Sequence, residues 1–386
     1  MKNSIIKKIF AILIILFFFK IPCFATENNI NDNNTQKILN EQYDKLNLNK
    51  LEDAIPKETK EDLQNIGINP QNPQDIQNFN ITNLFSYIAS KISKILKTPL
   101  TIFINCIAIM LLCAIFNSFK TTACGENLKN VIGALIALCT CGILITPIIK
   151  CVTDISEIIK NFSNFMLCFI PVFVGLIAMS KGVLTSITYN STMFILAQLI
   201  SYITSDLLLP ITGSFLALSI SGSVNESFNI TGLTGAVKKV IIFTLSLLVT
   251  IFVGIFSIQN TISVNADSMG FKTAKFLSSS FIPIIGGSLG DALASIVGGL
   301  NIIKSAVGGL GILICILTLV PPILTVGFFI IFSSFAKEIA TALEIPTMTK
   351  ILGSIKDCLS ILLAFLICYG ILIISTTTII ITMGAK

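Results

Sequence analysis

The sequence predicts an all-α polytopic membrane protein with about eight spans, a candidate inverted repeat, an N-terminal signal peptide and a short polar exported segment. Of its 386 residues, 53% are hydrophobic and 12% are charged, whereas soluble domains carry about 25% charged residues. Apolar runs of about 20 residues, the length of a helix that crosses a bilayer, recur along the chain. These observations define the fold class before any single element is assigned.

Residues 1–25 have the three parts of a secretory signal peptide. Lysines at positions 2, 7 and 8 precede an apolar stretch over 9–19, and small or modest residues (Cys23-Phe24-Ala25) surround a cleavage position after Ala25. A retained signal anchor is the alternative. In either case the segment that follows is exported.

Residues 26–82 form that polar exported segment, which is rich in Asn, Gln, Asp and Glu. We expect disorder over 28–34 and a short helix over 35–51. Four residues then break the chain repeatedly: Pro56, Gly67, Pro70 and Pro73. A segment of this size with few aromatic residues cannot bury a substantial core alone, so we expect it to dock on a partner.

Residues 83–98 are expected to form an amphipathic interfacial helix. One side carries the apolar residues Leu84, Ile88, Ile92, Ile95 and Leu96, and another carries Lys91, Lys94 and Lys97. A helix of this kind lies in the membrane surface or packs on a partner, and the sequence favours the surface.

The multispan membrane domain covers 99–386. We expect spans at 99–119, 131–149, 164–180, 187–209, 240–258, 281–300, 306–332 and 358–382. The stretch 211–221 is too short to cross and is expected to be re-entrant. Pro321 and Pro322 should kink or break the seventh span, because each proline removes a backbone donor.

Topology and a weak repeat complete this expected layout. The signal peptide places residues 26–98 outside the cytoplasm, because the first segment usually sets the orientation. Phe169-Ile170-Pro171 recurs as Phe281-Ile282-Pro283, and Pro210-Ile211 recurs as Pro322-Ile323. Both recurrences have the same offset, which moves the chain by three spans and would give two copies of opposite topology.

Composition argues against several functional classes. The chain has no His, the commonest general base and metal ligand. It also lacks a G-x-x-x-x-G-K-[ST] phosphate loop. The net charge of +6 comes from scattered lysines and is not a nucleic-acid footprint. Most of the eleven cysteines lie in apolar runs, where Cys packs as a small hydrophobe. We therefore expect no catalytic site, cofactor or metal, and no nucleic acid among the partners.

Two charged residues beside spans receive ordinary explanations. Asp206 lies near the end of the span expected at 187–209, so its carboxylate should reach the interface. Lys304 lies between two expected spans and should extend its ammonium group toward water.

The stretch 259–280 is expected to be a cytoplasmic loop that holds a functional cluster. Its only charges are Asp267, Lys272 and Lys275, and the two lysines are one helical turn apart. The alternative is that these lysines only obey the positive-inside rule.

The next helix, read from Phe281, carries two rows of small residues. One row contains Gly286, Gly290, Ala294 and Gly298, and the other contains Gly287, Asp291, Ser295 and Gly299. Small residues let helices approach closely in a bilayer, and an ionisable residue at membrane depth indicates function by default. A tightly packed structural helix with a satisfied Asp291 is the alternative.

The same region carries a resemblance to a known family. The motifs are Gln259-Asn260, Ala266-Asp267, Lys272-Thr273-Ala274-Lys275-Phe276, Phe281-Ile282-Pro283, Gly286-Gly287 and Asp291. With the signal peptide, exported segment and multispan body, they resemble the stage III sporulation protein AE family of endospore-forming bacteria. The Arg-free, Ile-, Lys- and Asn-rich composition suits a clostridial-type spore former.

This resemblance implies a non-catalytic membrane subunit required for endospore formation. Such proteins belong to a channel or secretion-like complex in the mother-cell membrane facing the forespore, with other sporulation membrane proteins and the lipid bilayer as partners. A self-sufficient secondary transporter is the alternative, because an inverted repeat with broken helices and a mid-membrane Asp291 would suit one.

Overall fold

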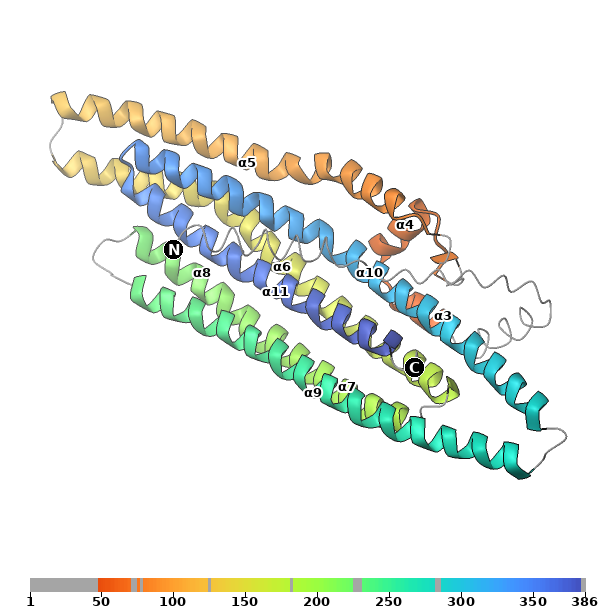
Figure 1. Ribbon diagram of the computed structural model, residues 1–386. Coiled ribbons are helices and arrows are strands. Elements are labelled where there is room, and N and C mark those ends of the chain that lie inside the picture. The colour runs from red at the N-terminus through yellow and green to blue at the C-terminus, as the bar shows by residue number, and fades with distance from the viewer. Residues whose placement is uncertain are drawn as a thin grey trace. The chain divides into compact units, whose positions relative to one another are not determined.

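The computed structural model describes residues 48–70, 75–76, 79–123, 126–180, 183–224, 231–281 and 286–382, and these residues contain helices and no strand. Figure 1 shows their arrangement. The helices are α3 (Leu48–Ala54), α4 (Lys57–Asn65), α5 (Ile81–Ala123), α6 (Glu126–Ser180), α7 (Val183–Tyr202), the π-helical turn η2 (Ile203–Leu208), α8 (Leu209–Val224), α9 (Thr231–Phe281), α10 (Gly286–Ala342) and α11 (Pro346–Thr382).

Six helical segments among the described residues are long and apolar enough to cross a membrane. They are Thr82–Ile115, Gly142–Leu176, Ser191–Gly222, Gly232–Ile255, Ile303–Ala342 and Pro346–Thr378. The all-α multi-pass class is therefore confirmed, whereas the count of eight spans is not. The signal peptide lies outside the described residues, as does Pro283 of the candidate repeat, so both features stay predictions.

Two pairs of expected spans are single continuous helices. The spans expected at 131–149 and 164–180 both lie in α6, which has 55 residues. Residues 286–300 and 306–332 both lie in α10, which has 57 residues and continues through Pro321 and Pro322, so of the expected kink or break the structure excludes the break. At 1.5 Å per residue these helices are more than about 80 Å long. Low hydropathy between two apolar runs therefore did not end the helix.

The expected re-entrant stretch 211–221 is also part of a longer helix. The segment α7, η2 and α8 runs without interruption from Val183 to Val224 and includes Pro210. One π-helical turn within it contains Asp206. Because a π-turn accommodates an extra residue in the hydrogen-bonding pattern, the helix continues where the sequence suggested a break.

The packing core lies between α6, α10 and α11. Phe162, Phe165 and Phe169 of α6 are each 1% exposed or less, and the rings of Phe165 and Phe169 stack at 5.2 Å. Gly311 of α10 faces this stack, because a Cβ atom there would lie 2.3 Å from the Phe169 ring. Only glycine allows α6 and α10 to approach this closely.

A tight turn connects α10 to α11, which pack against each other over much of their length. Glu344 has a φ of 55°, and the Ile345 amide donates to the Ala340 carbonyl. This left-handed residue ends α10 in the manner of a Schellman motif. Pro346 then occupies the first turn of α11, where its missing N–H costs nothing.

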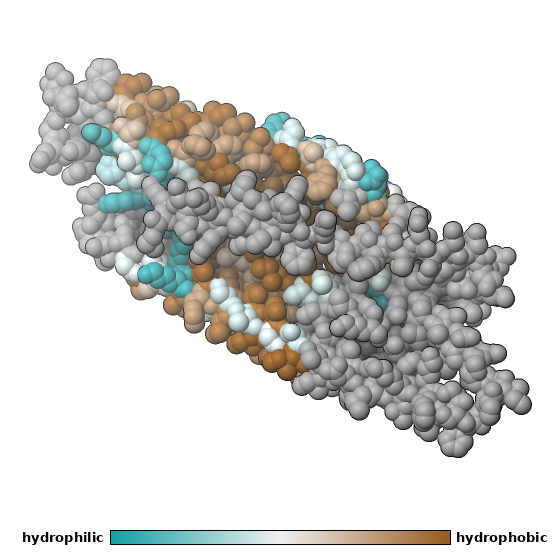
Figure 2. All heavy atoms as spheres, viewed as in Figure 1, coloured by the Kyte–Doolittle hydropathy of each residue, from teal (hydrophilic) through white to brown (hydrophobic). Residues whose placement is uncertain are grey.

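The helices differ in how much of their apolar surface the protein itself covers. In the most apolar window of α11, 61% of residues are buried, against 22% in the corresponding windows of α5, α7–α8 and α9. Figure 2 shows hydrophobic side chains over much of the described part of the visible face, with hydrophilic patches between them. α11 is thus a core helix, and α5, α7–α8 and α9 are peripheral.

Part of the expected exported segment packs on the membrane helices of the same chain. α3 contacts α6, and α4 contacts α10. Gly67 has a φ of +80°, and the Ile68 amide donates to the Leu63 carbonyl in a second Schellman-type end. Leu63 and Ile68 are 0% and 2% exposed. The segment therefore buries its few apolar residues against the helical bundle, and the expected disorder over 28–34 lies outside the described residues.

The expected amphipathic helix 83–98 is not a separate surface helix. It forms the first turns of α5, which continues through Pro99 into the apolar stretch. Ile88 and Ile95 line a small cleft against Leu317 and Leu324 of α10. The apolar side of this helix therefore packs on a neighbouring helix of the same chain instead of on lipid.

Candidate functional site

The structure changes the setting of three predicted site residues. Asp267, Lys272 and Lys275 lie in α9, which extends to Phe281, so the expected loop at 259–280 is wrong. Residues 259–280 contain no proline, and loss of hydropathy alone does not end a helix outside the membrane. The side chains of these three residues lie outside the described part of the chain.

The other predicted site residues lie near the start of α10. The helix begins at Gly286 and not at Phe281, so Gly286, Gly290 and Asp291 occupy its first two turns. Pro283 and all side chains of this region lie outside the described residues. The close approach expected of the small-residue rows therefore stays a prediction.

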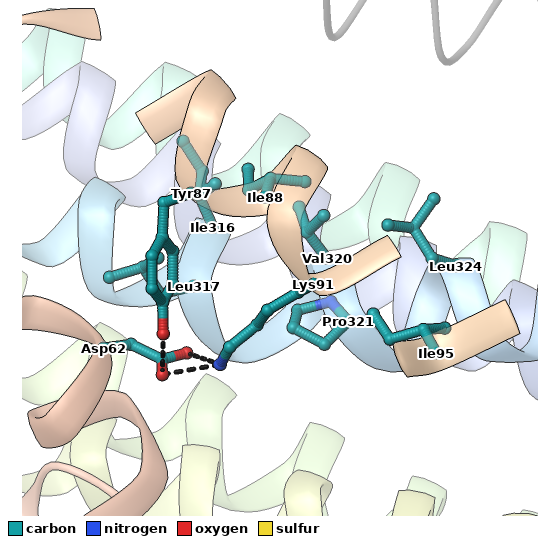
Figure 3. A pocket seen from close by; sticks show the side chains of 10 residues that line it. All are labelled: Asp62, Tyr87, Ile88, Lys91, Ile95, Ile316, Leu317, Val320, Pro321 and Leu324. Carbon is teal, nitrogen blue, oxygen red and sulfur yellow. Dashed lines mark hydrogen bonds and ion pairs between the residues drawn. The ribbon is translucent and has the colours of Figure 1, made fainter. Parts of the chain in front are cut away.

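The described residues instead contain a polar cluster between α4 and α5, which we call the Asp62 cluster: Asp62, Tyr87 and Lys91. Tyr87 and Lys91 are four residues apart and so lie on one side of α5. Lys91 Nζ donates to both carboxylate oxygens of Asp62 at 2.6 Å, and the Tyr87 hydroxyl donates to Asp62 Oδ1 at 2.5 Å. Figure 3 shows both side chains reaching the Asp62 carboxylate.

The hydrogen bonds of the Asp62 cluster matter for stability because the Asp62 carboxylate is buried. The Asp62 side chain is 8% exposed and that of Lys91 is 32% exposed. A buried carboxylate without a partner is strongly unfavourable, so its two charge-assisted hydrogen bonds are needed to hold α4 on α5. Lys91 Nζ also lies 5.0 Å from the centre of the Tyr87 ring, which further orients the ammonium group.

A second contact attaches α4 to α10 at the paired prolines. Thr59, one turn before Asp62 and 2% exposed, shares a hydrogen bond of 2.8 Å with Thr318 between their Oγ1 atoms. Pro321 and Pro322 have no N–H, so the carbonyls of Leu317 and Thr318 lack the donor that an ordinary helix provides four residues later. α4 therefore docks where the backbone hydrogen bonding of α10 is weakest.

The Asp62 cluster attaches α4 to the long helices beside it. Its carboxylate is fully engaged by two donors, and apolar residues of α5 and α10 line the cleft beside it, including Ile88, Ile316 and Val320 (Figure 3). Among the described residues, no group of three or more His, Cys, Asp and Glu side chains could hold a metal ion. The arrangement fixes a short preceding segment to two long helices.

Sequence reasoning missed the role of Asp62. It placed Lys91 on the polar side of an amphipathic helix and treated Gly67 as a chain break. The available signal was local: Pro56 before the helix, Leu63 and Ile66 on one side of it, and a glycine at its end. That pattern predicts α4, but it does not identify the partner of Asp62.

Two charged residues lie in other places than expected. Lys304 is 2% exposed inside α10, so it does not extend to an interface between two spans. Asp206 is exposed in the middle of the apolar segment Ser191–Gly222. Thr204, two residues earlier, lies beside Tyr369 of α11, and the adjacent Gly370 faces Leu319 of α10.

These contacts fix the depth of Asp206 in the bundle. Leu319 lies near the middle of an uncharged run of α10 between Lys304 and Lys337. A carboxylate level with Leu319 is therefore far from both ends of the apolar stretch. The expectation that Asp206 lies near the end of its span is wrong, because α7 and α8 form one long helix.

Six long apolar helices in the described residues define a multi-pass helical membrane protein. The chain belongs to the stage III sporulation protein AE family, whose model matches residues 71–384. The match includes α5 to α11 and hence Tyr87, Lys91 and Thr318, whereas α3 and α4 precede it. The name of this family refers to stage III of sporulation.

The chain is similar to a stage III sporulation protein AE of Bacillus subtilis (strain 168), with 26% identity over 238 residues. The aligned region is 60% of this chain and 58% of that protein, so the chain spans less than two thirds of the length of this relative. No solved structure matches the chain.

Proposed function

We propose that the chain is a non-catalytic membrane subunit of a channel or secretion-like complex between mother cell and forespore. Residues 26–98 would enter from the extracytoplasmic side of the mother-cell membrane. The family supports the sporulation role, and the apolar helices support the membrane location. The other subunits would be sporulation membrane proteins.

The observation that carries this proposal is the attachment of α3 and α4 to the helical bundle. A segment of this size needs a surface on which to fold, and the Asp62 cluster and the Thr59–Thr318 hydrogen bond provide one. The attachment holds the exported segment in a fixed position on α5 and α10. A subunit that must present an exported surface to partners requires such a fixed position.

The decisive experiment is affinity purification of the tagged full-length protein from sporulating cells of the source organism. We expect other sporulation membrane proteins to co-purify and deletion of the gene to abolish heat-resistant spores. Reconstitution of the purified protein alone in vesicles provides the opposing test. Solute uptake without any partner would overturn the proposal in favour of a self-sufficient transporter.

The orientation has its own test. A cysteine placed at Asn33, within the segment proposed to be exported, should react with a membrane-impermeant maleimide in intact cells. Labelling only after permeabilisation would place this segment in the cytoplasm and reverse the proposed topology.

We also propose functional roles for the predicted residues of α9 and α10. Lys272→Ala combined with Lys275→Ala should abolish sporulation at normal protein level, whereas exchange of both lysines for Arg would be tolerated if they only anchor topology.

Gly290→Leu should disrupt assembly, and the matched change Ile296→Leu should not. Asp291→Asn keeps size and hydrogen bonding, so loss of sporulation in this variant would indicate a role for the charge.

A further inference from the structure

The path of the chain through the membrane fixes the side on which α9 ends. α3 and α4 precede α5, so they lie on the side from which α5 enters the membrane. α5, α6, the continuous segment α7–η2–α8 and α9 each contain an apolar stretch long enough to cross. Because a continuous helix keeps one direction, it crosses a bilayer once. Four crossings therefore return the chain to the side of α3 and α4, where α9 ends and α10 begins.

This side is opposite to the one expected from the sequence. The spans expected at 131–149 and 164–180 are parts of the single helix α6, so they count as one crossing instead of two. The stretch 259–280, which was expected in the cytoplasm, then lies on the side of the exported segment. The predicted functional residues of this region follow it to that side: Asp267, Lys272, Lys275 and Asp291.

The distribution of lysines between the two sides agrees with the signal peptide. Lysines concentrate near helix connections on the cytoplasmic side of a membrane. The connections α5–α6, α8–α9 and α10–α11 lie opposite to α3 and α4, and the lysines nearest to them are Lys120, Lys129, Lys238, Lys239, Lys337, Lys350 and Lys356. Those nearest to the connections α6–α7 and α9–α10 are Lys181, Lys272 and Lys275. The α10–α11 turn is therefore cytoplasmic, and α9 ends on the exported side.

The exported location removes the ordinary explanation of two lysines. The positive-inside rule accounts for lysines that stay in the cytoplasm, so it does not account for Lys272 and Lys275. The two residues are three positions apart in α9 and so share one side of the helix. Two neighbouring positive charges outside the cytoplasm fit a partner surface that carries acidic side chains.

The connected ends of α9 and α10 extend past the neighbouring helices. Gly370 of α11 faces the side chain of Leu319, and α11 runs antiparallel to α10, so α11 ends level with about position 307 of α10. Gly311 of α10 faces Phe169, so α6 ends level with about position 300 of α10. Residues 286–299 of α10 thus extend about 20 Å beyond the described ends of α6 and α11, at 1.5 Å per residue.

We infer that the ends of α9 and α10, residues 267–281 and 286–299, form an interaction surface on the exported side of the membrane. We call them the α9–α10 arm. Its partner is the exported domain of another membrane protein, which meets the lysine pair with acidic side chains. The side of the membrane follows from the helices themselves, whereas the partner's membership of a sporulation complex rests on the proposed function.

Cysteine labelling of the full-length protein in growing cells tests the side. Ser279→Cys lies in the arm, and Ala342→Cys is the matched control at an exposed position beside the α10–α11 turn. A membrane-impermeant maleimide should label Ser279→Cys at least tenfold more than Ala342→Cys in intact cells, and both should react after permeabilisation. The unaltered chain gives the background of the native cysteines. Stronger labelling at position 342, or equal labelling at both positions in intact cells, would overturn the inference.

Photo-cross-linking in sporulating cells tests the partner. With p-benzoylphenylalanine in place of Ser279, mass spectrometry should find cross-links to exported regions of another membrane protein. Lys272→Glu and Lys275→Glu combined should reduce these cross-links at least tenfold, whereas Lys239→Glu, an exposed position at the cytoplasmic end of α9, should not. No cross-link, cross-links only to cytoplasmic regions, or cross-links unchanged by the charge reversal would overturn the inference. The labelling requires no partner, so a failure of the proposed function alone would leave the labelling result unchanged.

Discussion

Two aspartates at a similar depth in the bundle have opposite surroundings. Asp62 lies beside Pro321 and Asp206 is level with Leu319, so both face the middle of the uncharged run of α10. The Asp62 side chain is 8% exposed and bonded to two donors, whereas Asp206 is exposed and bonded to none in the described chain. The same residue type thus serves internal attachment in one place and an outward surface in the other.

The difference follows from what each neighbouring helix provides. α5 has Tyr87 and Lys91 one turn apart, directed at α4, so the chain satisfies Asp62 by itself. The sides of α7 and α8 that pack on α6 and α11 are apolar or carry short hydroxyls, so Asp206 faces away from them. Replacing Tyr87 or Lys91 should therefore lower the folding stability of the single chain, because Asp62 loses a hydrogen-bond donor. Replacing Asp206 should leave that stability unchanged.

The largest effect is expected for Lys91→Ala. The change leaves the Asp62 carboxylate buried without its charged partner, which should lower the free energy of unfolding by about 3 kcal/mol. Unfolding of the full-length protein by SDS in mixed micelles measures it. Lys94→Ala is the matched control, because Lys94 is exposed on the same helix and should change stability by less than about 0.5 kcal/mol. Equal losses in the two variants would contradict the attachment role.

The second prediction compares two tyrosines. Tyr87→Phe removes one donor from a charged and buried acceptor and should cost about 1.5 kcal/mol. Tyr202→Phe removes an exposed hydroxyl without a described partner and should leave the stability of the monomer unchanged. The same SDS titration, at a protein-to-detergent ratio low enough to keep the chain monomeric, measures both. A larger loss for Tyr202→Phe would reverse the comparison.

The Thr59–Thr318 hydrogen bond should give a smaller effect. Thr59→Val or Thr318→Val alone leaves one buried hydroxyl without its partner and should cost about 1 kcal/mol. The two changes together replace both partners with groups of similar shape and should cost less than the sum of the single changes. A double-mutant cycle measures this coupling. Strict additivity would show that the two hydroxyls do not stabilise the docking of α4.

Much of the fold class could be predicted from the sequence, because apolar composition and the absence of long polar blocks after residue 99 leave few alternatives. The boundaries of the helices could not be predicted from the sequence. Hydropathy reports where lipid can surround a helix, and α6, α9 and α10 continue well beyond such stretches. Pro321 and Pro322 marked an expected kink or break and 211–221 an expected re-entrant stretch, but both regions lie within continuous helical segments.

The candidate site was harder to predict, because its partners are far apart in sequence. Asp62 and Lys91 are 29 residues apart, and Thr59 and Thr318 are 259 apart. No local pattern connects such positions. The helical spacing of Tyr87 and Lys91 was visible, but the buried acid that both contact depends on how α4 turns back onto α5. The predicted residues from Asp267 to Asp291 were chosen from local patterns, and their side chains lie outside the described residues.

The smallest effect is expected for Asp206→Asn in the monomer, and this null result sharpens the comparison most. Asparagine keeps the size of the side chain and an acceptor but removes the charge. Because no described residue bonds to Asp206, unfolding of the monomer should change by less than about 0.5 kcal/mol, while Asp62→Asn weakens a charge-assisted pair and should lower stability measurably. If Asp206→Asn destabilised the dilute monomer as much as Asp62→Asn, the acid would be satisfied within its own chain, and the two aspartates would have the same role.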